Sequence, residues 1–312
     1  MTSRQAEHFV THFTYSYLPQ ALALYFSLKR THEKAILWLV CLDQYSFHAL
    51  NTFNLSNVHL INFEDYLDDE LLQIRKERSL GEFCWTVTPI VPKIILDIDS
   101  SIDRITYIDA DLWFMRASDA IYQEFDNNKS VLITSHSYAK KYDQSSLSGK
   151  YCVQFIIFTR DAENIRSLWE KECREWCYAR PEGGKFGDQK YLDKWPLIFP
   201  NQVHVLRNTN WALAPWNAVE KSASLGIFYH FHSFKIINKF LAWIGKYDIP
   251  SQYLSEIYKS YAKDINKALS IMCKHEFPLE KSFTINASFV YRYFKSLINT
   301  SGKRWKQFIK LT

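Results

Sequence analysis

The sequence predicts an α/β fold in which a mostly parallel sheet is flanked by helices, and three observations support this prediction. Strand-like apolar runs alternate with segments of helical periodicity from residue 18 to residue 176. This alternation supplies the helical crossovers that parallel strands need. In addition, 47% of the 312 residues are hydrophobic and 16% are aromatic, with eight Gly and nine Pro. Such a composition indicates a large packed core and argues against disorder.

The expected elements follow one another in this alternation. Apolar residues from Leu18 to Leu28 recur at helical spacing, and the strand-like run AILWLVCL (35–42) comes next. The further expected strands are 58–62, 104–109, 130–135 and 151–160. The further expected helices are a short one through Phe47 and Leu50, a charged amphipathic one over 66–79, an apolar one over 88–98 with proline at its entry, and a long one from Ile165 to Trp176.

Charge is distributed unevenly along the chain. The net charge is +5, but the 32 residues from Lys281 onward contain seven Lys or Arg and no acid, so residues 1–280 carry −2. The main body shows no basic groove, which argues against nucleic acid as a partner. We therefore expect a main domain over residues 1–245, followed by a basic, aromatic-rich helical extension over 246–312.

The cysteines and the apolar runs bear on cellular location. No apolar run approaches the length of a membrane span, and MTSRQAEHFVTHF (1–13) lacks a signal-peptide core. The six cysteines are scattered. Cys173 and Cys177 lie four apart on one helix face, but no second pair or nearby His completes a zinc site. Buried thiols in a reducing cytoplasm are therefore expected.

Two carboxylates end the strand in RITYIDADLWF (104–114). In open α/β sheets ligands bind beyond the carboxyl ends of strands, and residues two apart in an extended chain point the same way. Asp109 and Asp111 would repel each other there unless a divalent cation lay between them. A short Asp-x-Asp in an exposed turn would bind nothing. The apolar strand and the following Trp113 and Phe114 argue against that reading.

Three later stretches add chemistry to this acid pair. GGKFGDQKYLDKWP (183–196) places Asp188 and Gln189 directly after a glycine-containing loop. NTNWALAPWN (208–217) is dense in Trp and Asn, as sugar-binding surfaces often are, so Trp216 and Asn217 are candidate substrate contacts. FYHFHSFK (228–235) contains two histidines. Either His230 or His232 could complete the ligand shell of a metal ion.

Together these stretches resemble glycosyltransferase family 8 and its relatives with the GT-A (Rossmann-like) fold, which are nucleotide-sugar enzymes common in bacterial surface polysaccharide synthesis. The resemblance covers roughly residues 8 to 240. It rests on the order of five stretches, YLPQALALYFSL, YIDADLWF, YCVQFIIF, DQKYL and HFHSFK. It implies a metal-dependent glycosyltransferase that moves a sugar from a nucleotide-diphosphate sugar to a glycan or lipid-linked acceptor, with retention of the anomeric configuration.

The resemblance also implies roles for individual residues. Asp109 and Asp111 would hold Mn2+ or Mg2+ on the donor diphosphate, with His230 as the third protein ligand. Lys235 would reach toward a phosphate, although it stands one place earlier than the lysine of the relatives.

Further implied roles concern the donor sugar and its base. Asp188 and Gln189 would flank the anomeric carbon. Only Tyr17 survives from the Asp-x-Asn-Tyr stretch that reads base and ribose in the relatives, so the base is left open. Where relatives have Asn-Ala-Gly-Val, this chain has Cys152 to Phe155, and Gln154 is expected to contact sugar or acceptor.

Other classes of protein remain open at this point. Phosphatases of the haloacid dehalogenase type also place Asp-x-Asp after a strand, but they need Thr or Val where Trp113 stands. A noncatalytic carbohydrate-binding module would explain the Trp and Tyr content but not the acid pair. A catalytically inactive relative that serves as a scaffold is the main alternative, because Thr14 and Cys152 occupy positions where the relatives differ.

The C-terminal segment 287–312 interleaves apolar and aromatic residues with six Lys or Arg. We expect two short amphipathic helices, split at Ser301 and Gly302, that dock on an anionic membrane surface. The other interpretation is that the segment packs on the main domain as a closing helix. The membrane interpretation places the protein in the cytoplasm, peripherally at the inner face of the membrane, where a lipid-linked acceptor is made.

Overall fold

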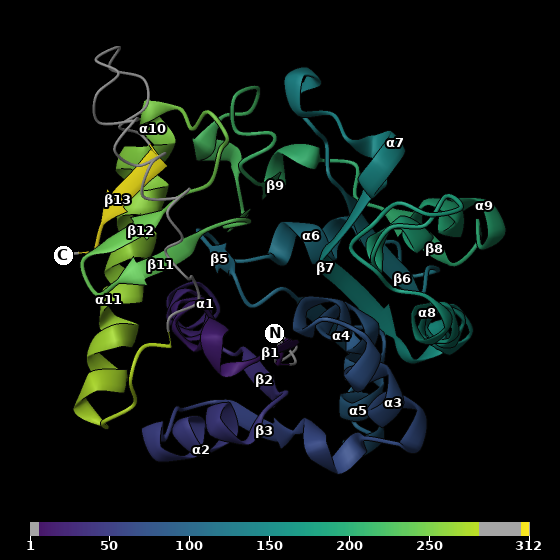
Figure 1. The fold of residues 1–312 in the computed structure, drawn as a ribbon. Helices are drawn as coiled ribbons and strands as arrows, with labels where there is room; N and C mark the ends of the chain where they lie inside the picture. Colours follow the sequence, from purple (N-terminus) through teal and green to yellow (C-terminus); the bar gives the residue numbers. More distant parts are fainter. Residues whose placement is uncertain (1–5, 281–306, 312) are drawn as a thin grey trace, which may run out of the picture.

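The computed structural model describes residues 6–280 and 307–311, and its centre is a seven-stranded sheet with the strand order β3-β2-β1-β4-β7-β6-β8 (Figure 1). The strands of this sheet are β1 (His8–Phe13), β2 (Ile36–Cys41), β3 (Val58–Asn62), β4 (Arg104–Ile108), β6 (Val131–Ser135), β7 (Tyr151–Thr159) and β8 (Val203–Val205). Two three-stranded sheets adjoin it, β5 (Leu112–Phe114) with β10 (Phe228–His230) and β9 (Ala212–Leu213), and β11 (Lys235–Asn238) with β12 (Leu241–Trp243) and β13 (Phe308–Lys310).

Helices connect and cover these strands. They are α1 (Leu18–Thr31), α2 (Gln44–Phe53), α3 (Asp69–Glu77), α4 (Leu80–Val87), α5 (Ile90–Ile98), α6 (Asp119–Glu124), α7 (Ser145–Ser148), α8 (Glu163–Glu175), α9 (Trp195–Ile198), α10 (Ser251–Tyr253) and α11 (Lys259–Lys274). Short 3-10 turns join several of them, and one of these turns, Gln189–Lys194, carries a predicted site residue.

The strand directions confirm a mostly parallel sheet. Strands β3, β2, β1 and β4 are parallel neighbours, and β6 pairs in parallel with β8. Strand β7 alone runs the other way, antiparallel to both β4 and β6. Because the chain runs outward from β1 to β3 and then returns to place β4 on the other side of β1, the strand order reverses between β1 and β4. Such a switch point is where ligands bind in open α/β sheets.

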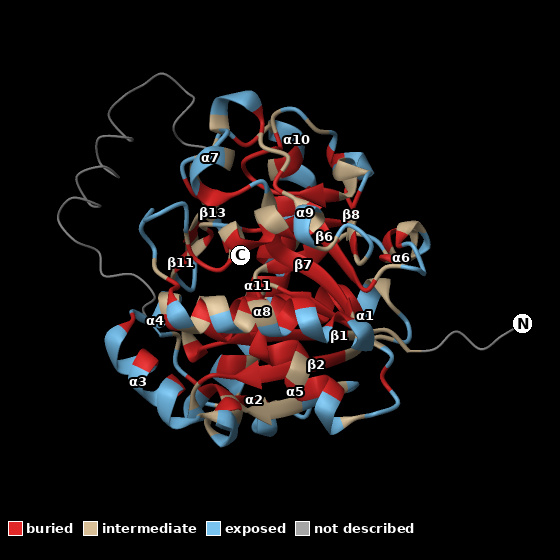
Figure 2. Ribbon diagram, turned by 90° about the vertical axis from the view of Figure 1, so that its right-hand side faces the viewer, coloured by how far each residue is buried: buried red, intermediate tan, exposed pale blue. Residues whose placement is uncertain are grey.

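Alternating side chains of the central strands build two cores, one on each face of the sheet. In β1, Phe9 and Phe13 pack with α1 and α2, whereas Val10 packs with α4, α5 and α8. This alternation follows from the period of two in an extended chain. Figure 2 shows β1, β2 and β7 coloured as buried, with the outward side of α3 exposed. The sheet is therefore covered on both faces, as a mostly parallel sheet requires.

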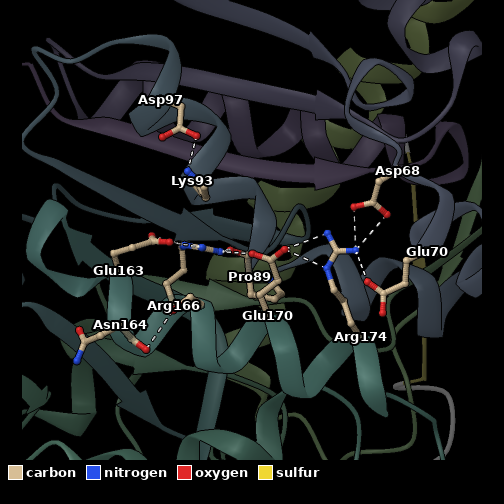
Figure 3. A network of polar contacts seen from close by, with 11 residues as sticks. Asp68, Glu70, Pro89, Lys93, Asp97, Glu163, Asn164, Arg166, Glu170 and Arg174 are labelled. Atoms are coloured by element: carbon tan, nitrogen blue, oxygen red, sulfur yellow. Dashed lines mark hydrogen bonds and ion pairs between the residues drawn. The ribbon is translucent and has the colours of Figure 1, made fainter.

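A network of ion pairs fixes α8 to the helices beside it (Figure 3). The Arg166 guanidinium, whose side chain is 3% exposed, donates to Glu163, to Glu170 and to the carbonyl oxygen of Pro89 at the start of α5. About two turns further on, Arg174 pairs with Glu170 and reaches the acids that begin α3. These contacts set the distance between α8 and the α3–α5 segment.

The C-terminal helix α11 packs beside α1 (Figure 1). Asp264 accepts two hydrogen bonds from the Arg30 guanidinium, at 2.9 and 2.6 Å, and one from the indole nitrogen of Trp113 at 2.7 Å. Tyr261 and Ile265 of the same helix are fully buried in a core that also contains Phe231. Residues on both sides of the expected domain boundary at position 245 thus share one core.

Much of the predicted membrane segment, residues 287–306 and 312, lies outside the described residues. Phe308–Lys310 is described, and it forms β13, antiparallel to β12. For these three residues the prediction of a membrane-facing helix is wrong, because their backbone groups pair with β12 and the neighbouring Leu311 is buried. Among the described residues, no helix combines the length and hydropathy needed to cross a bilayer.

The cysteines are free thiols, as expected. Those buried in the structure are Cys41, Cys152, Cys173 and Cys177, whereas Cys84 is part-buried. Cys273, near the end of α11, is exposed, so the prediction of buried thiols is wrong at that position.

Candidate active site

A cavity of about 520 Å³ opens at the carboxyl ends of β1 and β4, at the switch point of the sheet. Thr14, Ser16 and Tyr17 line it from the segment after β1, and Asp109 and Asp111 line it from the segment after β4. Its position agrees with the rule that open α/β sheets bind ligands at such a point.

The backbone and a tyrosine hold Asp109 in place at the end of β4. The N–H of Asp109 donates to the carbonyl oxygen of Gln154 on β7 at 3.1 Å, and the N–H of Leu112 closes the following turn onto the Asp109 carbonyl at 3.0 Å. The Tyr107 hydroxyl donates to Asp109 Oδ1 at 3.0 Å. The second carboxylate oxygen of Asp109, Oδ2, faces His230.

Strand β10 brings His230 to the two aspartates. It pairs antiparallel with β5, so that His230 lies opposite Leu112, directly after the acid pair. His230 Nε2 is 3.2 Å from Asp111 Oδ1 and 3.6 Å from Asp109 Oδ2. His232 lines the same cavity, but it does not belong to this three-residue group. Of the two histidines that the sequence left open, the geometry brings His230 to the acids.

The three side chains suit a divalent cation. One ligand atom from each of Asp109, Asp111 and His230 lies within 4.8 Å of the other two. Neighbouring ligands of a six-coordinate ion with bonds near 2.1 Å are about 3 Å apart, close to the contacts seen here. Two carboxylates with one imidazole make a mixed oxygen and nitrogen set that fits Mn2+ or Mg2+, with further positions left for a substrate.

The charges of the cavity are unbalanced. Burial, with the charge of Asp111 adding to it, raises the pKa of Asp109 to about 7, although His230 opposes the shift. Burial, with the charge of Asp109 adding to it, raises the pKa of Asp188 to about 8. Burial lowers the pKa of His230, but the two aspartates outweigh it and hold that pKa well above its usual value. Among the described residues that line the cavity there is no Lys or Arg. A bound cation would relieve this excess of acid.

The predicted site residues divide into those at the cavity wall and those away from it. Besides the metal group, Tyr17, Asp188, Gln189 and Trp216 line the cavity. The backbone carbonyl of Asp188 accepts a hydrogen bond from the Trp169 indole at 2.9 Å, which fixes the start of the 3-10 turn that carries Gln189. With the metal group, these residues come from five separate segments of the chain, so the fold gathers what the sequence separates.

Three predicted residues do not line the cavity. Asn217 is 1% exposed, and its amide bonds to the backbone at Ala212 and Ala214, which holds the turn that carries Trp216. The Lys235 ammonium lies 6.0 Å from the centre of the Trp243 ring on β12. Gln154 is 1% exposed and lies behind His230. The structure therefore gives no support to direct substrate contact by Gln154 or Asn217, or to the phosphate role of Lys235.

Sequence reasoning missed two parts of the cavity wall. One consists of His136, which stacks on Tyr138 with ring centres 4.6 Å apart, and of Tyr247. No local pattern singles these residues out. The other part is α4, which contributes Trp85. Its capping box, Ser79 with Glu82, is visible in the sequence and could have revealed this helix.

The chain is similar in sequence to two proteins of Bacillus subtilis strain 168, and no family model matches it. It is 27% identical to YfnF over 241 residues, which covers 71% of this chain and 79% of YfnF. It is 23% identical to YfnD over 248 residues, which covers 74% of this chain and 79% of YfnD. Both proteins bear the description "uncharacterized protein".

Solved structures of glycosyltransferases share its fold. The apo structure of the bifunctional glycosyltransferase WbbM aligns over 90% of this chain and 53% of its own, with a TM-score of 0.52 and 12% identity. The glycosyltransferase GlyE of Streptococcus pneumoniae TIGR4 aligns over 90% of this chain and 67% of its own, with a TM-score of 0.51 and 14% identity. The chain has a GT-A glycosyltransferase fold. The predicted fold class is thereby confirmed.

Proposed function

We propose that this protein is a metal-dependent glycosyltransferase of the family 8 type that moves a sugar from a nucleotide-diphosphate sugar to a glycan or lipid-linked acceptor. The observation that carries the proposal is the convergence of Asp109, Asp111 and His230 in a cavity at the switch point of the sheet. The shared glycosyltransferase fold supports it, because the cavity lies where such a fold binds ligands.

In this proposal the three converging side chains hold Mn2+ or Mg2+. When bound, the ion would act as a Lewis acid that neutralises the departing diphosphate. Asp109 and Asp111 bring the two negative charges, and His230 adds a neutral nitrogen ligand. The absence of Lys and Arg among the described residues of the cavity wall leaves this task chiefly to the ion.

The remaining cavity residues orient the two substrates. Asp188 and Gln189 lie beside the reacting carbon, where the carboxyl group of Asp188 can accept a hydrogen bond from a sugar hydroxyl. Tyr17 lies on the side of the base, and Trp216 offers an apolar face for a sugar ring. We propose retention of the anomeric configuration, in which an oxygen of the leaving diphosphate takes the acceptor proton.

The setting that we propose is bacterial surface polysaccharide synthesis at the cytoplasmic face of the membrane. The basic composition of residues 287–306 favours attraction to anionic lipids, whereas β13 ties Phe308–Lys310 to the main domain. Co-sedimentation with anionic liposomes at low and high salt, with residues 287–306 replaced by a neutral linker as the comparison, tests this part. Equal sedimentation of the two proteins would contradict it.

A ligand screen tests the enzymatic proposal. UDP-, GDP- and CMP-sugars are added with and without Mn2+, and both melting temperature and sugar release are recorded. At least one sugar nucleotide should raise the melting temperature only when Mn2+ is present, and that donor should be turned over. Stabilisation without any turnover or hydrolysis would favour the catalytically inactive scaffold, and no response to any donor would reject the nucleotide-sugar site.

A further inference from the structure

Gln154 contacts two of the three residues of the candidate metal group, although it does not line the cavity. Its backbone carbonyl oxygen accepts the hydrogen bond from the N–H of Asp109 at 3.1 Å. Its side-chain oxygen Oε1 lies 2.9 Å from Nδ1 of His230. Both Gln154 and His230 are buried, at 1% and 7% exposure, so this amide–imidazole contact is shielded from water.

The chemistry of the amide determines which ring nitrogen of His230 carries a proton. An amide oxygen can only accept a hydrogen bond, so Nδ1 of His230 must be the donor. The other nitrogen, Nε2, then has a free lone pair for a metal ion, and it lies on the side of the ring that faces Asp111 and Asp109. Outer partners of this kind fix the tautomer and the ring orientation of metal-binding histidines.

Gln154 lies on β7, one residue before the stretch of that strand that pairs with β4. Strand β7 pairs with β4 on one side and β6 on the other, with Phe155 opposite Ile108 at the end of β4. The Trp216 ring also packs edge-on against His230, with ring centres 5.4 Å apart. His230 is thus held by a hydrogen bond and by an aromatic contact, while Asp109 is held by the same strand that carries the amide.

We propose that Gln154 is the positioning residue of the metal site, and that its side-chain oxygen holds His230 in the Nδ1–H tautomer with Nε2 directed at the cation. This inference rests on the proposed metal site. It gives Gln154 a role through His230, in place of the direct contact with sugar or acceptor that the sequence suggested.

Mn2+ binding to purified full-length protein, measured by titration calorimetry without any nucleotide, tests the proposal. Gln154→Leu removes the acceptor oxygen at similar side-chain size, and its Mn2+ dissociation constant should rise by about 10- to 100-fold. Gln154→Glu keeps an acceptor oxygen at the same reach and should stay within a few-fold of the wild type. Gln20→Leu is the matched control, because Gln20 is equally buried but does not line the cavity or contact the metal group.

A spectroscopic measurement keeps the proposal falsifiable even if Gln154→Leu does not fold. In wild-type protein loaded with Mg2+ and labelled with 15N-histidine, long-range 1H–15N correlation spectra should show His230 protonated at Nδ1 and metal-bound at Nε2. An unprotonated Nδ1, or unchanged Mn2+ affinity in folded Gln154→Leu, would overturn the role of Gln154. In that case loss of Mn2+ binding in Asp111→Asn would still uphold the metal site, whereas a wild type that binds no divalent ion would overturn both proposals.

Discussion

Charged side chains meet in two clusters of this molecule: a balanced one around α8, in which each acid contacts an arginine, and an unbalanced one in the cavity, whose described wall contains no Lys or Arg. Around α8, the cation of Arg166 has an acid on each side, Glu163 and Glu170, together with a backbone carbonyl (Figure 3). In the cavity, Asp109 and Asp111 have one histidine, His230, beside them in the metal group. Asp188 is a third acid of the same cavity.

The pKa values of the carboxyl groups record this difference. Hydrogen bonds from Arg166 hold the pKa of Glu163 below its usual value. Burial raises the pKa of Asp109 to about 7 and that of Asp188 to about 8. A balanced cluster stabilises the fold by itself, whereas an unbalanced one costs stability until a ligand of the opposite charge binds. The comparison teaches that buried acids without an arginine partner mark the candidate site, whereas acids that contact an arginine mark the structural cluster.

The largest effect is expected when the cavity loses one of its charges. Asp111→Asn should lower metal-dependent turnover by orders of magnitude, because a neutral amide cannot offset the charge of the cation. The melting temperature of the metal-free variant should fall below that of the wild type, because burial opposes the charge of Asp111 but His230 at 3.2 Å outweighs it and holds the Asp111 pKa below its usual value. Turnover assays in saturating Mn2+ and thermal melts in EDTA measure the two quantities. Near-wild-type turnover would remove Asp111 from the metal site.

Removing the cation of the balanced cluster should act on stability instead. Arg166→Met should lower the free energy of unfolding by about 1–3 kcal/mol, because the Pro89 carbonyl loses its buried donor and Glu170 keeps only Arg174 as its partner. Urea unfolding measures this loss. Mn2+ affinity of the folded variant should not change, and a clear change would show that the two clusters are coupled.

The free energy of unfolding should depend on pH in opposite directions for the two clusters. The lowered pKa of Glu163 makes stability rise as pH rises through the titration of this group. The raised pKa of Asp188 means that the folded protein binds more protons than the unfolded chain between about pH 4 and pH 8, so stability falls as pH rises through this window. In EDTA, Asp188→Asn should therefore melt a few degrees above the wild type at pH 8, and the gap should close toward pH 5. A gap that does not depend on pH would contradict the raised pKa.

The smallest effect is expected at the exposed edge of the balanced cluster. Lys93 and Asp97 form an ion pair one helical turn apart on α5, and both side chains are largely exposed. Lys93→Ala should change the free energy of unfolding by no more than about 0.5 kcal/mol, because water and salt screen such pairs. A larger loss in urea unfolding would mean that the exposed pair supports the Arg166 network.

The parts of the fold that the sequence predicted are those with a strong local pattern. The apolar strand at 35–42 and the long helix from Ile165 to Trp176 match β2 and α8 closely. Strand β1 lay outside the periodic runs, because His8 and His12 interrupt its apolar residues. Helix α4 was missed because eight residues contain too few turns for a clear period.

The candidate site was predictable where the chain itself places groups side by side. The spacing of Asp109 and Asp111 is local, and it predicted their convergence. The contact between Gln154 and His230 depends instead on which strands become neighbours, since 76 positions separate the two residues. Sequence alone did not indicate that Gln154 would face the histidine, because pairing of β7 beside β4 and the return of β10 are properties of the whole fold.

The reversed direction of β7 has a consequence for how this enzyme scaffold could diversify. Because β7 is antiparallel to its neighbours, it begins at the end of the sheet where β4 and β6 end. The segment 136–150, which precedes β7, therefore lies at the candidate site. The hydrogen bond from the Asp109 N–H holds the backbone of Gln154 in place, while that segment, which carries Tyr138, Gln144 and Ser148 of the cavity wall, can change in length and sequence. Under the proposed function, exchange of this segment is a route to new acceptors that leaves Asp109, Asp111 and His230 in place.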